Sequence, residues 1–179
     1  TVTAGQSEQP FGLDAVSADK NGTCMERGLP FAFVTTRAPG LMLGSSGVNW
    51  SANAGVFGEP VGNAQSGDEG LGVVGRATYA TVFGANQLIH VGAAGVLRYP
   101  TAENSTNTTG TKFSTVRFRG KPESNVLAQR LVDTGEIRDV DSFRIEGLEL
   151  AGQFGALSLQ SEGHWVQVQR QSGRTLDFN

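Results

Sequence analysis

The sequence predicts an all-β fold, an antiparallel transmembrane β-barrel or part of one, on three observations. Glycine makes up 25 of the 179 residues and the mean hydropathy is −0.20, which favours many short strands joined by turns over a helical bundle. Several segments alternate between apolar residues and polar or small ones, the period of a strand with two different faces. The connections between these segments alternate between short and long, as they do at the two ends of an outer-membrane barrel.

The first expected strands are residues 1–6, 41–44 and 49–57. In the third of these the alternation is strict, because its odd and even positions differ in character throughout. Its apolar face carries Trp50, Ala52, Ala54 and Val56, and its polar face carries Asn49, Ser51, Asn53 and Gly55.

The next two expected strands are residues 72–82 and 88–99. In the first, Val73, Ala77 and Tyr79 lie on the face opposite Arg76 and Thr78. The second is about as long as a tilted strand that crosses a bilayer, and Tyr99 at its end suits the aromatic girdle of the membrane interface. Its apolar row is Ile89, Val91, Ala93, Gly95, Leu97 and Tyr99, opposite Leu88, His90, Gly92, Ala94, Val96 and Arg98.

Residues 143–152 and 157–169 are expected to form a hairpin around residues 153–155. The polar face of its second strand carries Ser158, Gln160, Glu162 and His164. Because Glu162 and His164 are two positions apart, they share a face and are close enough to interact. We interpret them as polar residues of a water-facing row rather than as a catalytic pair.

Short connections are expected at 45–47, 83–87 and 153–155, and long ones at 7–40, 58–70 and 100–142. The apolar faces consist of small residues interrupted by glycine, which suits contact with lipid better than the core of a sandwich. A soluble β-sandwich that binds polysaccharide or polyanion remains the alternative. It would use Arg117, Arg119 and Lys121 together with Trp50 or Trp165.

The composition argues against several classes of function. A net charge of −3 gives no general attraction to nucleic acid, and two histidines and one cysteine cannot assemble a zinc site. We find none of the common nucleophile, phosphate-loop or metalloprotease motifs, so we expect no enzyme, no cofactor and no metal. No run of 18 apolar residues occurs, so no membrane-spanning helix is expected.

Three cations are spaced by two in residues 112–123, namely Arg117, Arg119 and Lys121. In an extended segment they point one way, while Phe118 points the other. Arginine binds phosphate or carboxylate through two parallel hydrogen bonds. The three cations therefore either bind an anion or pair with Glu123, Asp133 or Glu136, and both readings stay open.

A series of motifs, in order along nearly all of the chain, resembles the phosphate-selective porin O/P family. They are GQSEQPFGLD, MERGLPFAF, NWSANAGVFGE, GDEGLGVVGRATY, HVGAAGVLRYP, FRGKPES, LVDTGEI and GLELAGQFGALSLQSE. The resemblance implies a trimer of 16-stranded barrels in the bacterial outer membrane that conducts anions passively. It also implies that residues 1–179 form a single barrel segment from the middle of the family pattern, with about seven or eight strands.

The resemblance further implies that residues 7–40 fold into the pore as a constriction loop and that residues 100–142 form a long loop region. Arg27 would present a cation to passing anions, Lys20 is a second candidate, and Arg76 would also line the pore. The expected partners are small anions such as phosphate, outer-membrane lipid and two further copies of the chain. Where phosphate-specific members have lysine after Gly-Leu-Glu, this chain has Asp14 and Ala15, so a looser preference for anions or polyanions is equally open.

Overall fold

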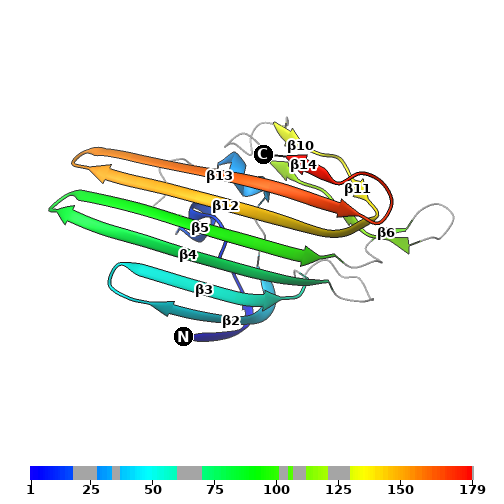
Figure 1. Ribbon diagram of the computed structural model, residues 1–179, viewed down its shortest axis with the longest axis horizontal. Coiled ribbons are helices and arrows are strands. Elements are labelled where there is room, and N and C mark those ends of the chain that lie inside the picture. The colour runs from blue at the N-terminus through cyan, green and yellow to red at the C-terminus, as the bar shows by residue number, and fades with distance from the viewer. Residues whose placement is uncertain are drawn as a thin grey trace.

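The computed structural model of the chain describes residues 1–17, 28–33, 37–59, 70–100, 105–106, 112–120 and 130–178. Its main feature is one eight-stranded antiparallel sheet in the order β1-β2-β3-β4-β5-β12-β13-β14 (Figure 1). The strands of this sheet are β1 (Val2–Ser7), β2 (Ala38–Ser46), β3 (Trp50–Phe57), β4 (Leu71–Gly84), β5 (Gln87–Tyr99), β12 (Val140–Phe154), β13 (Leu157–Arg170) and β14 (Leu176–Phe178).

The remaining elements are short. The helix α1 (Leu13–Val16) and the 3-10 helix η2 (Leu29–Phe33) lie between β1 and β2 in the sequence. Between β5 and β12 the described residues form three two-stranded pairs, β6 (Ser105–Thr106) with β7 (Lys112–Phe113), β8 (Thr115–Val116) with β11 (Ile137–Arg138), and β9 (Arg119–Gly120) with β10 (Val132–Asp133). No helix in the described ranges has the length and apolar character needed to span a membrane.

The strands of the main sheet carry two different faces, and the alternation expected from the sequence is confirmed. Trp50, Val91 and Leu97 are 47, 43 and 40% exposed, whereas Phe57, Val74 and Val96 on the opposite face are 3% exposed or less. We call the first the outer face and the second the inner face. Other large apolar side chains exposed on the outer face are Leu41, Leu43, Val56, Leu71, Val73, Tyr79, Tyr99, Leu148, Leu150, Leu157, Leu159 and Trp165.

The buried core lies between the inner face and the segments that cover it. Phe118, which precedes β9, has ring contacts with Phe33 of η2, Phe143 of β12 and Phe178 of β14, with centroids 5.6 to 6.0 Å apart. The remaining core includes Phe11, Ala38, Phe57, Val74, Val96, Ile145, Val166 and Val168. Phe11, Phe33 and Phe118, which lie outside the main strands, are therefore packed against the inner face.

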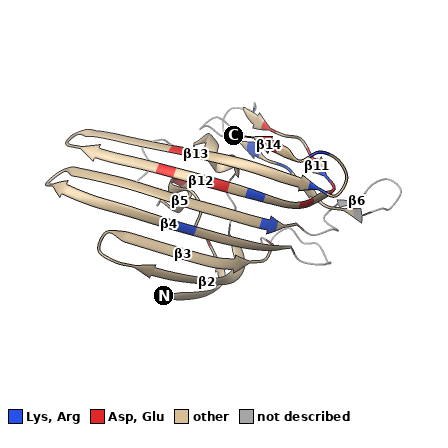
Figure 2. Ribbon diagram, viewed as in Figure 1, with Lys and Arg blue, Asp and Glu red and all other residues tan. Residues whose placement is uncertain are grey.

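The four long strands have the dimensions expected of membrane-crossing strands. They contain 13 to 15 residues each, more than the 9–11 or so that cross a bilayer at a tilt. The parts of these strands nearest the short turns, at 77–84, 87–97, 150–154 and 157–161, contain no Lys, Arg, Asp or Glu (Figure 2). In the turn between β12 and β13, Gly155 has a φ of 64°, a conformation that glycine adopts without strain.

The largest differences from the expected boundaries, three residues each, are at the starts of two strands. β2 begins at Ala38 rather than near residue 41, because Ala38, Pro39 and Gly40 already pair with β1. β12 begins at Val140 rather than residue 143, since Val140 pairs with Arg170 and is itself buried. In β2, small residues such as Ala38 and Gly40 hide the start of the alternation. In β12, the irregular register between Val140 and Ser142 hides it.

The topology decides between the two fold classes considered. In the described part of the chain the long strands form one sheet, not the two sheets packed face to face that a sandwich requires. β1 and β14 occupy the two edges and do not pair with each other there, so this sheet is open. The fold is the curved antiparallel wall expected of part of a barrel, and the soluble sandwich is not supported.

The division between the faces predicts different costs for truncating apolar side chains. Ile145 is fully buried on the inner face, between Val96 and Val166 in register. We expect Ile145→Ala to lower the free energy of unfolding by about 2–5 kcal/mol through the cavity it leaves. Leu150→Ala, on the exposed face, should cost less. Urea unfolding of the refolded full-length protein measures both, and equal losses would contradict the assignment of faces.

Candidate functional site

The inner face carries a buried ion pair that joins three strands. Glu149 of β12 reaches past β5 to Arg76 of β4, with 2.8 Å from its Oε1 to Nη2 and 3.1 Å to Nε. The Nε2 of His90 on β5 lies 3.2 Å from the same oxygen. The side chains of Arg76 and Glu149 are only 10 and 4% exposed, so both charges are largely removed from water.

A glycine makes this arrangement possible. Gly92 pairs in register with Glu149, and a Cβ atom at Gly92 would collide with the carboxylate. Without a side chain there, the carboxylate crosses over β5 to reach Arg76. The predicted anion-binding residue Arg76 is therefore placed on the inner face, but its charge is compensated by Glu149.

A second inner-face cation was not among the residues singled out from the sequence. Arg98 of β5 donates a hydrogen bond from Nη2 to the carbonyl oxygen of Gly58 at 3.1 Å, and its Nη1 lies 3.4 Å from Oε2 of Glu59. Its side chain is 6% exposed. The alternation of residues 88–99 had placed Arg98 in the same row as His90, so the pattern could have identified it as a buried charge.

Arg117 and Arg119 lie outside the main sheet, and both are exposed. Arg117 forms a two-pronged ion pair with Asp133, with 2.8 Å from Nε to Oδ1 and 2.6 Å from Nη2 to Oδ2. Its hydrogen bonds to Asp133 raise the pKa of Arg117. Of the two readings of this segment, the pairing with Asp133 accounts for Arg117, whereas Arg119 points into solvent. Three other predicted cations, Lys20, Arg27 and Lys121, lie outside the described residues.

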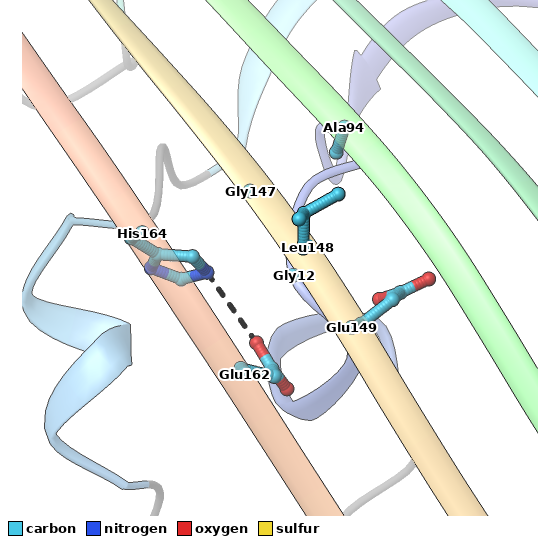
Figure 3. A pocket seen from close by; sticks show the side chains of 7 residues that line it. All are labelled: Gly12, Ala94, Gly147, Leu148, Glu149, Glu162 and His164. Carbon is cyan, nitrogen blue, oxygen red and sulfur yellow. Dashed lines mark ion pairs between the residues drawn. The ribbon is translucent and has the colours of Figure 1, made fainter.

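Glu162 and His164 of β13 form a second polar pair on the inner face. Glu162 of β13 pairs with Glu149 across the strands, and its Oε2 lies 3.5 Å from Nε2 of His164. The interaction expected from their spacing is therefore present. Figure 3 shows how these residues line a small pocket, with Glu162 turned toward His164 and Glu149 turned toward β5; the lining residues are Gly12, Ala94, Gly147, Leu148, Glu149, Glu162 and His164.

The chemistry of this face is electrostatic. Arg76 and Arg98 each lie beside a carboxylate, and the acceptors are carboxylates and backbone carbonyl groups. Among the residues that the structure describes, no group of three or more His, Cys, Asp and Glu side chains could hold a metal ion. A sheet with paired charges on one face and apolar side chains on the other is typical of a barrel wall around a water-filled interior.

The comparisons with known proteins agree with part of a barrel wall. The family model for phosphate-selective porin O and P matches residues 1–179, the whole chain. The chain belongs to this porin family. No curated protein and no solved structure matched the sequence.

The buried pair predicts a strong energetic coupling between Arg76 and Glu149. We expect Glu149→Ala to lower the free energy of unfolding by about 3–5 kcal/mol, because it leaves a buried guanidinium without its partner. The double variant with Arg76→Ala should cost less than the sum of the two single changes, by about 0.5–3 kcal/mol.

The control for this cycle is the pair Arg138 and Glu136, which lies outside the main sheet. Their side chains are 3.7 Å apart and 60 and 55% exposed, so their coupling should be about 0–1 kcal/mol. Urea unfolding of the full-length protein gives both cycles. Equal coupling in the two pairs would contradict a structural role for the inner pair.

The Arg117–Asp133 pair predicts a shifted titration. Hydrogen bonds from Arg117 and from the backbone N–H of Gly135 hold the pKa of Asp133 well below its usual range. A lowered folded-state pKa contributes stability above the unfolded value of about 3.9, and this contribution is lost as the pH falls through the folded value. A carboxyl ¹³C titration should show Asp133 ionised throughout pH 4–8, and Arg117→Gln should raise the pKa of Asp133 although the hydrogen bond from Gly135 remains. An unchanged titration in Arg117→Gln would refute the pairing.

Proposed function

We propose that this chain forms part of the wall of a bacterial outer-membrane porin through which anions diffuse passively. The permeant anion would be phosphate or another small anion or polyanion. The proposal includes no covalent chemistry and no cofactor. The observation that carries it is the division of the sheet into an apolar outer face and a charged inner face, in a chain of the phosphate-selective porin family.

The outer face is proposed to meet lipid. Its exposed leucine, valine and aromatic side chains lie on six neighbouring strands, β2, β3, β4, β5, β12 and β13. A monomeric protein in water rarely exposes so large an apolar surface, whereas the wall of a barrel presents one to acyl chains. A homotrimer, as in the family, would cover part of the same surface with neighbouring copies.

The long connection between β1 and β2 is proposed to narrow the pore. Support comes from its described parts, because Phe11 is fully buried against the inner face and Phe33 contacts Phe118 there. Irregular backbone at membrane depth is tolerated where it faces water or protein rather than lipid. The region 100–142 would contribute loops at the same end of the wall.

The cations proposed to attract anions are Arg27, Lys20, Arg117, Arg119, Lys121 and Arg76. A narrow site selects anions when cationic side chains replace part of their hydration, and several weak sites in series let them leave. Arg76 and Arg117 each have a carboxylate partner, so they would attract anions less than a cation without one. We give the largest share of selectivity to Arg27 because the family resemblance places this position near the constriction.

Reversal potentials of the full-length protein in planar bilayers under a salt gradient test this proposal. We expect preference for anions in the native protein and a clear loss of that preference in Arg27→Ala. Arg144→Ala removes an arginine from the outer face and should leave the reversal potential unchanged. A native protein with no anion preference would overturn the proposed function, and an unchanged Arg27→Ala would overturn the role of Arg27.

A further inference from the structure

The segment that follows β1 turns back onto the inner face and is held there by an aromatic contact. The ring of Phe11 lies 5.1 Å from the ring of His164, centroid to centroid, directly over Gly147. A Cβ atom at Gly147 would lie 3.1 Å from Phe11 and 3.2 Å from His164, closer than side chains ordinarily approach. The absence of a side chain at Gly147 therefore lets Phe11 reach the wall.

A charged hydrogen bond holds the same segment three residues later. Oε1 of Glu162 accepts a hydrogen bond from the backbone N–H of Asp14 at 2.6 Å. Asp14 lies in the first turn of α1, where backbone N–H groups have no partner within the helix, and the preceding Gly12 has no side chain that could accept one. Glu162 supplies that acceptor from β13, and its negative charge strengthens the bond.

The later part of the connection between β1 and β2 also packs beside Asp14 and His164. The side chain of Asp14 accepts a hydrogen bond from the N–H of Gly28 at 3.0 Å. Five residues further on, the ring of Phe33 meets His164 edge-on, with centroids 6.5 Å apart and planes at 87°. His164 thus contacts both parts of the connection and also lies beside Glu162.

Glu162 and Glu149 would repel each other if they shared their surroundings, since they are opposite in register and line the same pocket. The structure separates them. Glu149 is turned toward Arg76 and His90, whereas Glu162 is turned toward His164 and the first turn of α1 (Figure 3). Each carboxylate therefore has its own partners among the described residues, and Glu162 is the one that accepts a hydrogen bond from the described part of the connection.

We infer that Glu162 and His164 are positioning residues that hold residues 9–17 and 28–33 against the inner wall. Together with Phe11, Asp14 and Gly147 they form what we call the wall latch. The latch fixes both ends of the intervening stretch, because Asp14 is bonded to Gly28 and to the wall at once. Its importance for conduction rests on the proposed function, whereas the latch itself does not.

Amide hydrogen exchange of the full-length porin in detergent tests the latch directly. We expect Glu162→Ala to speed exchange in peptides covering residues 9–17 by about tenfold or more, because the Asp14 N–H loses its acceptor and the segment opens locally. Glu162→Gln keeps an oxygen that can accept this bond, so it should stay closer to the native rate. Glu146→Ala, a glutamate on the outer face of β12, should leave these peptides unchanged.

A second pair of variants, one in β12 and its control in β5, tests the latch through the wall residue Gly147. Gly147→Leu places a side chain where Phe11 and His164 lie, whereas Gly95→Leu adds the same side chain on the outer face, where no atom lies within 4 Å of a Cβ. Faster exchange in residues 9–17 is expected for the first and not for the second. Heat-modifiable gel mobility checks that each variant has folded.

The outcomes separate the latch from the proposed function. Native exchange rates in residues 9–17 of folded Glu162→Ala and Gly147→Leu would overturn the latch, whatever the protein conducts. Failure of Glu162→Gln to improve on Glu162→Ala would contradict the hydrogen bond to Asp14 as its basis. Faster exchange together with unchanged single-channel conductance would support the latch and count against the connection as the narrow part of the pore.

Discussion

One antiparallel ladder determines where each side chain of the main strands lies. Neighbouring strands satisfy one another's N–H and C=O groups, so the backbone is paired even where its surroundings offer no water. The same geometry sends successive side chains to opposite faces. One face can therefore carry the exposed apolar side chains from Leu41 to Trp165, together with Arg144 and Glu146 of β12, while the other carries Arg76, Arg98, Glu149 and Glu162. A slip of one residue in any register would exchange the two faces.

On the inner face, charge pairing acts as the organising interaction. A charge taken out of water needs a close partner, and the partners found here lie on other strands or on the segments that cover the sheet. Glu149 ties β12 to β4, and Glu162 ties β13 to α1. The same pairs limit how strongly these residues could attract a passing ion. In the proposed channel, selectivity therefore depends on cations carried by the connections more than on those of the wall.

The sequence alone was sufficient to predict the two faces, because alternation is local and survives even where glycine interrupts it. Trp50, Val91 and Leu97 were assigned correctly from period two alone, and so was the sharing of a face by Glu162 and His164. The partner of Arg76 could not be predicted, since Glu149 is 73 residues away and becomes its neighbour only because β12 pairs with β5. The contact of Phe11 with His164 depends on the path of an irregular segment, which no period describes. The cations proposed from the family resemblance, Arg27 and Lys20, lie outside the described residues.

The central claim is that the outer row of the long strands meets acyl chains while the inner row faces water or protein. Fluorescent labels on single cysteines in a Cys24→Ser background test it most directly, at Ala77 and Ala93 on the outer face and at Thr78 and Ala94 on the inner face. In bilayers of the full-length protein, brominated lipid chains should quench the outer pair and leave the inner pair unquenched. Quenching of the inner pair, or of neither, would contradict the account.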